Sequence, residues 1–506
     1  MTIETNKQIE SRSSLLNARW LPIAILVLFF LLLSLISLGR PTGNDEGVWL
    51  YVGKMWMQEG MVPYVDTLEG KTPGIFYVYA LASLFPGIGF LAGRLLAIGA
   101  SVCAASVIFY GLQKYHSRAA GLVGTACFSL AFCWSSTGVN PSTTDTYVVL
   151  FVIVSWLSAL KAWSVYERSG RVFLWPVLSG IAMGLATNFK QIAITSFMAF
   201  ILVVLLYGAL RRDWKRTFCA LSAFCIGIVL AFSSVTLPLF VTGVSLREYW
   251  EGAWLILLQP GAATEAAITH RLYVGLVKWS SAEMRLFLPF LLCLLWMFVR
   301  NPAKRFAAGA LLIWIFLDFL GVNASGRYYS HQFKQILPSL CVMAGFVSGE
   351  FIEKSFPERA RYRQALAALL VTLTLVFFPA HAVINGISAL VFQRSDRARE
   401  IGYWVRDHST EEDYVQLAGG AISAVLPFTG RKAPGRLFHH CVWDIPGARY
   451  EFLHDVELRP PRYVIFHSQP DWDAPSWLNE WIQDHYQPAY QQFGIHVYER
   501  THIHQE

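Results

Sequence analysis

The chain has 506 residues, of which 55% are hydrophobic and only 15% are charged, and its mean hydropathy is +0.42. A chain of this length and apolarity is not a soluble globular protein, so we expect a polytopic membrane protein. Lysine and arginine outnumber aspartate and glutamate by 41 to 34, but they fall mostly in short clusters between apolar spans. This distribution indicates membrane topology and argues against nucleic acid as a partner.

The apolar stretches predict about eleven transmembrane helices in a mainly α-helical protein. They run at roughly 20–38, 90–111, 119–137, 145–163, 172–189, 191–210, 217–240, 284–299, 306–322, 335–352 and 365–386. Basic clusters recur in alternate loops, which should therefore be cytoplasmic, together with the N-terminus. The other loops, which should be extracytoplasmic, are residues 39–89, 136–144, 241–283, 323–334 and the tail after about 387.

The N-terminal region predicts a retained membrane anchor. Residues 2–19 are polar, and no small-residue cleavage site closely follows the first span, so a removed signal peptide is not expected. In the next loop, segments 45–59 and 74–85 carry aromatic and aliphatic faces bounded by glycine and proline. These segments predict short helices that lie in the membrane interface.

Asp45 and Glu46 form an adjacent carboxylate pair just outside the first span. One carboxylate can take a proton from an acceptor hydroxyl as general base, while the other orients the acceptor or binds a sugar hydroxyl. Asp45 is the predicted base. The alternative is a plain helix start, in which Asn44 or Asp45 caps the N-terminus and Glu46 lies in the first turn.

Lys71 follows in the same loop, within Gly70-Lys71-Thr72-Pro73-Gly74. The glycines and the proline favour a turn and let the backbone approach a ligand. With a carboxylate pair upstream, we expect Lys71 to contact a phosphate. The alternative is an interfacial lysine whose side chain reaches into water without binding a ligand.

Two further ionisable residues border apolar spans. Asp145 opens the fourth span on the same side of the membrane, either as a site residue or as a helix cap. Lys190 lies between two apolar spans with almost no loop, and ionisable groups at such a depth usually have a partner or a function. We therefore place Asp145 among the supporting residues and Lys190 among the phosphate-binding ones.

Arg327, Tyr328 and His331 precede the tenth span. Arg327 offers a planar fork of donors for phosphate oxygens, with Tyr328 and His331 beside it as supporting residues. Alternatively, Arg327 and Tyr328 anchor the chain in the interface and His331 is a solvated loop residue. No cluster assembles a metal site, so we expect no required cofactor, and a divalent metal is possible without being indicated.

The composition changes from about Arg394, where charge rises and apolar runs shorten. Runs at 414–418, 463–467 and 494–498 have the length of strands and are separated by turn residues. The sequence thus predicts two domains: a transmembrane domain at 1–390, whose loop 39–89 carries the site, and a small extracytoplasmic α/β domain at 391–506.

Taken in order, these stretches resemble the C-type superfamily of integral membrane glycosyltransferases. The similarity is to the bacterial relatives of dolichyl-phosphate-mannose protein mannosyltransferases and to the lipid A aminoarabinose transferase, and it covers most of the chain. The motifs that carry it are Asp45-Glu46, Tyr64-Val-Asp66, Lys71-Thr-Pro73-Gly74, Asp145, Gly184-Leu-Ala with Lys190, Gly326-Arg327-Tyr-Tyr-Ser-His331 with Leu337-Pro338, Pro460-Pro461-Arg462-Tyr463-Val-Ile-Phe466 and Val497-Tyr498-Glu499-Arg500. One departure is Thr72, where the family usually has the first of two prolines.

The resemblance implies transfer of a sugar from a polyprenyl-phosphate carrier to a hydroxyl on the outer face of the cell membrane. It implies Asp45 as the base, with Lys71 and Arg327 near the carrier phosphate. Direct displacement at the lipid boundary would invert the anomeric configuration. The acceptor, which can be a lipid, a glycan or a protein, the sugar and the length of the carrier stay open.

Two other classes of function remain as alternatives. A transporter or flippase of lipid-linked sugars would also place ionisable residues in the membrane. Against it, the chain shows no inverted repeat, and the candidate residues collect on one side. The second alternative is a non-catalytic scaffold that binds through its tail.

Overall fold

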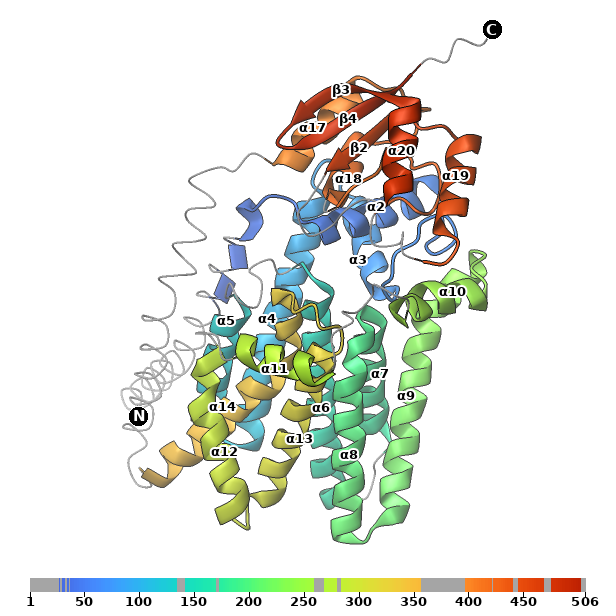
Figure 1. Ribbon diagram of the computed structural model, residues 1–506. Helices are drawn as coiled ribbons and strands as arrows, with labels where there is room; N and C mark the ends of the chain where they lie inside the picture. Colours follow the sequence, from blue (N-terminus) through green and yellow to red (C-terminus); the bar gives the residue numbers. More distant parts are fainter. Residues whose placement is uncertain are drawn as a thin grey trace, which may run out of the picture.

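The computed structural model describes nine continuous stretches of the chain and a few positions between residues 27 and 35. The continuous stretches are residues 37–133, 142–169, 173–258, 268–279, 284–355, 396–420, 422–439, 445–467 and 475–501. Figure 1 shows a bundle of long helices with a small sheet at one end.

Nine helices among the described residues follow predicted apolar spans. They are α4 (Gly89–Tyr115), α5 (Arg118–Phe132), α6 (Thr144–Ser169), α7 (Leu174–Phe189), α8 (Ile194–Arg211), α9 (Trp214–Val241), α12 (Leu288–Arg300), α13 (Arg305–Asn323) and α14 (Leu337–Ser355). Six helical stretches of the described chain are long and apolar enough to cross a membrane, so the prediction of a multi-pass membrane protein is confirmed. The total of eleven spans is not confirmed, because the spans at 20–38 and 365–386 lie wholly or largely outside the described residues.

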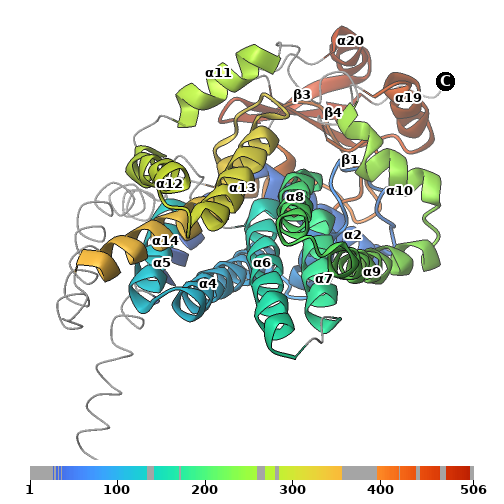
Figure 2. The ribbon, with the colours of Figure 1, turned by 90° about the horizontal axis from the view of Figure 1, so that it is seen from below.

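Small residues let the helices of the bundle pack closely. A side chain at Gly180 of α7 would meet the carbonyl of Phe224 on α9, and one at Gly227 of α9 would meet the carbonyl of Val177 on α7. Such contacts between small residues are typical of membrane helices, whose association gains little from the hydrophobic effect. Figure 2, in which the bundle is seen from below, shows α6, α7, α8 and α9 as neighbours.

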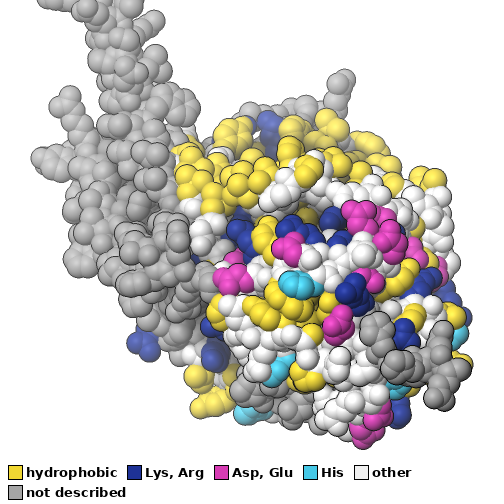
Figure 3. Space-filling model, turned by 90° about the horizontal axis from the view of Figure 1, so that it is seen from above, with side chains coloured by type: hydrophobic (Ala, Val, Ile, Leu, Met, Phe, Trp, Pro, Cys, Tyr) yellow, Lys and Arg dark blue, Asp and Glu magenta, His cyan; other side chains and the backbone are white. Residues whose placement is uncertain are grey.

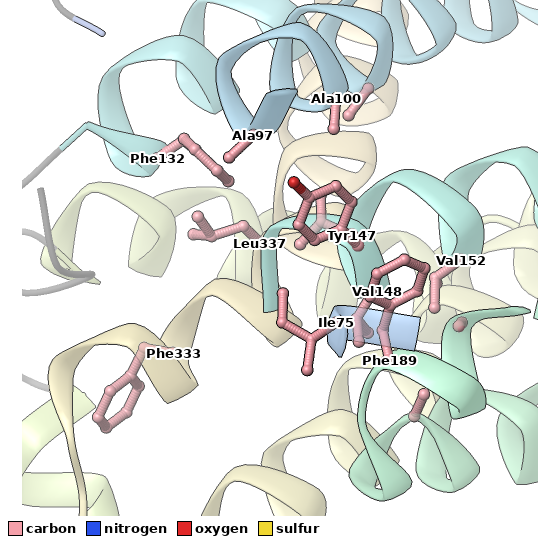
Figure 4. Close-up of a cluster of buried hydrophobic side chains, with 14 of the residues drawn as sticks. Ile75, Ala97, Ala100, Phe132, Tyr147, Val148, Val152, Phe189, Phe333 and Leu337 are labelled. Atoms are coloured by element: carbon pink, nitrogen blue, oxygen red, sulfur yellow. The ribbon is translucent and has the colours of Figure 1, made fainter. Parts of the chain in front are cut away.

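A cluster of buried apolar side chains joins the bundle to a short helix at its upper end (Figure 4). Ile75 from α3 (Gly74–Ser83) lies in it with Tyr147 of α6 and Phe189 at the end of α7. The rings of Tyr147 and Phe189 stack with centroids 4.6 Å apart. Offset stacking adds about 0.5–1.5 kcal/mol to the burial of such rings, so this contact helps to hold the start of α6 to the end of α7.

Two short helices lie between the bundle and the sheet, as predicted for segments 45–59 and 74–85. Helix α2 (Asn44–Glu59) begins with Gly43 as the N-cap, where the Glu46 carboxylate accepts the Gly43 backbone N–H at 2.9 Å. It ends at Gly60, whose φ of 69° is a left-handed conformation that glycine adopts without strain. Helix α3 starts directly after Pro73, and the two helices pack against each other.

The C-terminal region, residues 396–501, contains a four-stranded sheet in the order β1-β2-β4-β3. Strand β1 (Val415–Leu417) is parallel to β2 (Tyr463–His467), which is antiparallel to β4 (Ile495–Arg500). These three strands confirm the predicted ones. The edge strand β3 (Tyr486–Gln492) was not predicted, because its residues are mostly polar and its pairing is interrupted at Pro488.

Helices of the C-terminal region surround this sheet. Two elements of the region lie against α2, namely α18 (Leu426–Thr429) and the 3-10 helix η7 (Ser423–Val425). The helices are α17 (Arg397–Asp407), α18 (Leu426–Thr429), α19 (Ala448–Leu458) and α20 (Ser476–His485). A side chain at Gly47 of α2 would meet the backbone of Ser423 and Ala424. The Ala433 backbone N–H also donates to the Tyr51 hydroxyl on α2 at 2.8 Å. The C-terminal region is therefore seated directly on the helix that carries Asp45.

Candidate functional site

The two adjacent carboxylates at the start of α2 lie in different environments. Glu46 is buried and accepts from the Arg94 guanidinium of α4 at 2.9 and 2.7 Å. Asp45 is exposed. Since Gly43 is the N-cap, neither Asn44 nor Asp45 caps this helix. The oxygens of Glu46 are thus occupied within the protein, whereas Asp45 is accessible to a ligand.

Arg94 organises the chain that leads to Asp45. Its guanidinium also donates to the backbone carbonyls of Leu38 at 3.1 Å, Arg40 at 2.8 Å and Pro41 at 3.0 Å. A planar guanidinium with five donors can satisfy several carbonyls and a carboxylate at once. Arg94 therefore binds both the turn before α2 and the first turn of α2. Arg94 was not among the predicted site residues, although a charged residue inside a predicted span is a signal for such a role.

Asp145 and Lys190 form a buried ion pair. The Lys190 ammonium, at the C-terminal end of α7, lies 2.9 Å from each oxygen of Asp145 in the first turn of α6. Asp145 is fully buried, and the Lys190 side chain is 13% exposed. The expectation that Lys190 has a partner is met by this pair. Asp145 compensates the Lys190 charge, and the pair holds α6 to the end of α7. Whether Lys190 also contacts a phosphate stays a prediction.

The 3-10 helix η6 (Ser330–Ile336) brings further polar groups to the same place. His331 interacts electrostatically with Asp45, Asp145 and Lys190. Lys334, three residues later, is completely buried, interacts with Asp145, and lies with its ammonium 4.5 Å from the centroid of the Phe132 ring. Residues from α2, α6, the end of α7 and η6 thus converge.

Lys334 was absent from the predicted site. The sequence feature that could have identified it is its position at the very edge of the predicted span 335–352. Because burying a charge there is costly, a lysine at this position usually has a function or a partner.

Lys71 belongs to a second group of charges in the turn between α2 and α3. Its ammonium lies 3.0 Å from Glu69, and the other oxygen of Glu69 lies 3.0 Å from Nε2 of His439 in the C-terminal region. Burial would raise the pKa of Glu69, but Lys71 and His439 outweigh it and hold that pKa well below its usual range. Neither Glu69 nor His439 was predicted, because a contact across 370 residues leaves no local pattern.

The turn that carries Lys71 is tied to the end of α7. A side chain at Gly74 would lie 2.6 Å from the Asn188 carbonyl, and the Gln191 side-chain amide is 3.5 Å from the Gly70 carbonyl. Tyr64, whose φ of 71° is unusual for a residue with a side chain, closes the turn by donating to the Lys71 carbonyl at 2.7 Å. The segment with Lys71 therefore lies beside the one with Lys190, and Thr72 does not prevent α3 from starting after Pro73.

Arg327 and Tyr328 lie in the loop between α13 and η6. Arg327 is exposed, and its backbone N–H donates to the Ser325 hydroxyl at 3.3 Å. Tyr328 has a φ of 53° and donates its hydroxyl to the Arg271 carbonyl of α11 (Ile268–Trp279). Both residues are within four positions of His331 in the chain. Whether Arg327 meets the same ligand as Lys71 stays a prediction.

A cavity of about 270 Å³ lies between α11 and α13, next to this loop. It is lined mainly by apolar side chains, with one charged and one amide group: Ile268, Arg271, Leu272, Leu320, Asn323 and Ala324. In the part of the chain that the structure describes, no group of three or more His, Cys, Asp or Glu side chains is arranged to hold a metal ion.

Comparisons with known proteins agree with this architecture. Residues 70–237 match the family of dolichyl-phosphate-mannose-protein mannosyltransferases. No curated protein sequence matches the chain.

Among solved structures, the chain is similar to ArnT from Cupriavidus metallidurans bound to undecaprenyl phosphate, with a TM-score of 0.62 and 16% identity over 95% of this chain and 98% of that one. The apo form of the same protein gives 0.64 and 15% over 94% and 97%. The archaeal oligosaccharyltransferase AglB from Archaeoglobus fulgidus, in complex with an inhibitory peptide and a dolichol-phosphate, gives 0.54 and 12% over 96% of this chain and 75% of that one. The predicted resemblance is therefore confirmed: the chain has the fold of the C-type glycosyltransferase superfamily, and residues 70–237 carry the sequence pattern of its mannosyltransferase family.

Proposed function

We propose that this protein is a membrane glycosyltransferase that moves a sugar from a polyprenyl-phosphate carrier to an acceptor hydroxyl on the extracytoplasmic face. The observation that carries the proposal is the convergence of Asp45, Asp145, Lys190, His331 and Lys334 from separate elements at one end of the bundle. ArnT binds undecaprenyl phosphate and AglB binds dolichol-phosphate in the solved structures with this fold. A lipid-linked donor of the same chemistry would reach this end of the bundle from the bilayer.

In this proposal Asp45 is the general base. It is the exposed member of the carboxylate pair, and Glu46 with Arg94 fixes the turn on which it lies. A positioned base accelerates such a transfer by roughly 10²- to 10⁴-fold. Because Asp45 removes the acceptor proton while the acceptor oxygen attacks the anomeric carbon directly, the product should have the inverted configuration.

Lys71 and Arg327 are the proposed contacts of the carrier phosphate. Both side chains are more accessible than that of Lys190, and the Lys71 ammonium is held 3.0 Å from the Glu69 carboxylate. Cations that face a leaving phosphate stabilise the charge that develops on it as the glycosidic bond breaks. The cavity beside Arg271 is a suitable place for the first isoprene units, because its walls are mainly apolar.

The test is turnover of a polyprenyl-phosphate sugar by the purified full-length protein. With an acceptor hydroxyl present, or water in its place, the wild type should release polyprenyl phosphate, whereas Asp45→Asn should bind the carrier with unchanged affinity and release it about 10²- to 10⁴-fold more slowly. Asp484→Asn, at an exposed aspartate of α20 in the C-terminal region, is a matched control that should retain turnover. Full activity of Asp45→Asn would remove the proposed base, and movement of intact donor across the bilayer without release would favour a flippase.

A further inference from the structure

The C-terminal region holds the chain just before Lys71. The Leu68 backbone N–H donates to the Arg436 carbonyl at 3.0 Å, and the Arg436 side chain is 3.4 Å from the Tyr64 carbonyl. Nε2 of His439 lies 3.2 Å from the Leu68 carbonyl. These contacts fix the backbone from Tyr64 to Leu68 against residues 436–439.

A line of three side chains leads from His439 to Lys71. Nε2 of His439 is 3.0 Å from one oxygen of Glu69, and the other oxygen of Glu69 is 3.0 Å from the Lys71 ammonium. The two groups that Nε2 faces, the Leu68 carbonyl and the Glu69 carboxylate, are both acceptors. Nε2 must therefore carry a proton, and His439 donates to Glu69 whether or not the ring is charged.

The three side chains differ in exposure. His439 is 1% exposed, Glu69 is 7% exposed and Lys71 is 29% exposed. A buried carboxylate is stable only when its oxygens are paired, so the two donors hold Glu69 in a single orientation. Lys71 is the end of the line that a ligand can reach, and its position depends on that orientation.

We propose that His439 is a positioning residue that acts through Glu69 on Lys71 and so places the Lys71 ammonium for the phosphate of the lipid carrier. This inference rests on the proposed function, because it takes Lys71 as a phosphate contact. It assigns to the C-terminal region a part in donor binding. Loss of the His439 donor leaves one oxygen of Glu69 buried without that hydrogen bond, so Glu69 turns and Lys71 moves with it.

The test compares two amide substitutions at residue 439 in the full-length protein. In His439→Gln the side-chain N–H is as many bonds from Cβ as Nε2 is, so it can still donate to Glu69. In His439→Asn the side-chain N–H is one bond closer to Cβ, so it falls short of Glu69. The probe is polyprenyl phosphate alone. His439→Gln should bind it within about threefold of the wild-type affinity. His439→Asn should bind it about tenfold more weakly, the size expected for a lost hydrogen bond to a charged group.

A double-mutant cycle separates positioning from general damage. In a Lys71→Ala background, His439→Asn should cause no further loss of affinity, because its effect passes through Lys71. His467→Asn is the matched control, since the side-chain contact that the described residues show for His467 lies within the C-terminal region, with the Gly420 carbonyl at 3.4 Å. That control should bind like the wild type.

The outcomes distinguish the two proposals. If the wild type fails to bind polyprenyl phosphate, or if Lys71→Ala binds it as well as the wild type, the proposed function loses its donor contact and this inference falls with it. If Lys71→Ala weakens binding but His439→Asn does not, or does so equally in both backgrounds, only the role of His439 is overturned. Should His439→Asn unfold early, Glu69→Gln replaces it and should weaken binding by a similar factor; unchanged affinity would refute the inference.

Discussion

At the scale of single residues, the site is built by giving similar groups different surroundings. Asp45 and Glu46 are neighbours in the chain, but only Glu46 is buried and paired with Arg94. Adjacent residues of a helix point in different directions, so one can support the turn while the other faces a ligand. Lys190 and Lys71 are each paired with a carboxylate, but the Lys190 side chain is 13% exposed and the Lys71 side chain is 29% exposed.

Arg94→Ala should lower the free energy of unfolding by about 3–5 kcal/mol, because it leaves the Glu46 carboxylate buried without its partner. Activity should fall as well, since the turn before Asp45 loses its anchor. The control is Arg247→Ala, which removes an exposed arginine from an exposed ion pair with Glu251 and should cost about 0–1 kcal/mol. Equal thermal midpoints for the two variants in detergent would contradict the structural role of Arg94.

Asp145 and Lys190 should show strong coupling. Asp145→Asn or Lys190→Gln alone leaves a buried charge unpaired and should destabilise by about 3–5 kcal/mol, whereas the double variant should be more stable than the sum of the two losses predicts. Thermal unfolding of all four proteins measures the coupling. Additive losses would show that the two side chains do not depend on each other.

Glu69 makes stability depend on pH in a defined direction. The pKa of Glu69 is lower in the folded protein than in the unfolded chain, where it is about 4.3. Its contribution to the free energy of unfolding is therefore present above about pH 4.3 and is lost as the pH falls below that value. We expect the thermal midpoint of the wild type to fall more steeply than that of Glu69→Gln between about pH 5 and 3. Parallel pH profiles would mean that Glu69 is not held as a carboxylate by Lys71 and His439.

At the scale of elements, contacts between backbones place α2. Gly47 faces the backbone of Ser423 and Ala424. A side-chain carbon added at Gly53 would lie 2.5 Å from the backbone of Tyr79 and Ala80. Helix α2 is thus held between α3 and the C-terminal region, which makes the position of Asp45 a consequence of two packing contacts.

Gly47→Ala should therefore destabilise the protein by about 1–3 kcal/mol and reduce activity, because the added methyl group forces α2 away from rigid backbone. Gly99→Ala is the matched control, since that glycine is also helical but nothing lies within 4 Å of the added carbon. There the gain in helix propensity should stabilise slightly, by up to about 1 kcal/mol. Thermal unfolding and turnover would show the contrast, and equal behaviour of the two variants would refute the close contact at Gly47.

Elements were predictable where they follow from a local pattern. The spans from 90–111 to 335–352 are long apolar stretches, and helices lie at all nine of them. Strands at 414–418, 463–467 and 494–498 were likewise visible as short apolar runs. Strand β3 was not, since an exposed edge strand of mostly polar residues has no such pattern and forms only because β4 is its neighbour.

Several residues of the candidate site could be singled out from the sequence, but their contacts could not. Asp145 and Lys190 attract attention as charges beside apolar spans, yet nothing in the sequence states that they pair. Lys334 and Arg94 carry the same signal inside or at the edge of spans. No sequence feature marks His439, because its proposed role depends on its contact with Glu69, which is far from it in the chain.

At the scale of the whole molecule, apolar and charged surfaces lie on different parts. Helices α9 and α12 expose large apolar side chains, among them Val229 at 61% and Trp296 at 61%, as a lipid-facing surface requires. Lysine, arginine, aspartate and glutamate gather on the face of the C-terminal region (Figure 3). Helices α2 and α3 lie between these two parts (Figure 1), with Asp45 in the first turn of α2 and Lys71 in the turn before α3.

The proposed function depends on this arrangement, because it would bring a lipid-linked donor and an acceptor hydroxyl to one place. The most direct test is an experimental structure of the full-length protein with polyprenyl phosphate bound. We predict a phosphate oxygen within about 3 Å of the Lys71 ammonium, with the Asp45 carboxylate facing the same space beneath the C-terminal region. A phosphate bound at the opposite end of the bundle, or one separated from Lys71 by other protein groups, would contradict it.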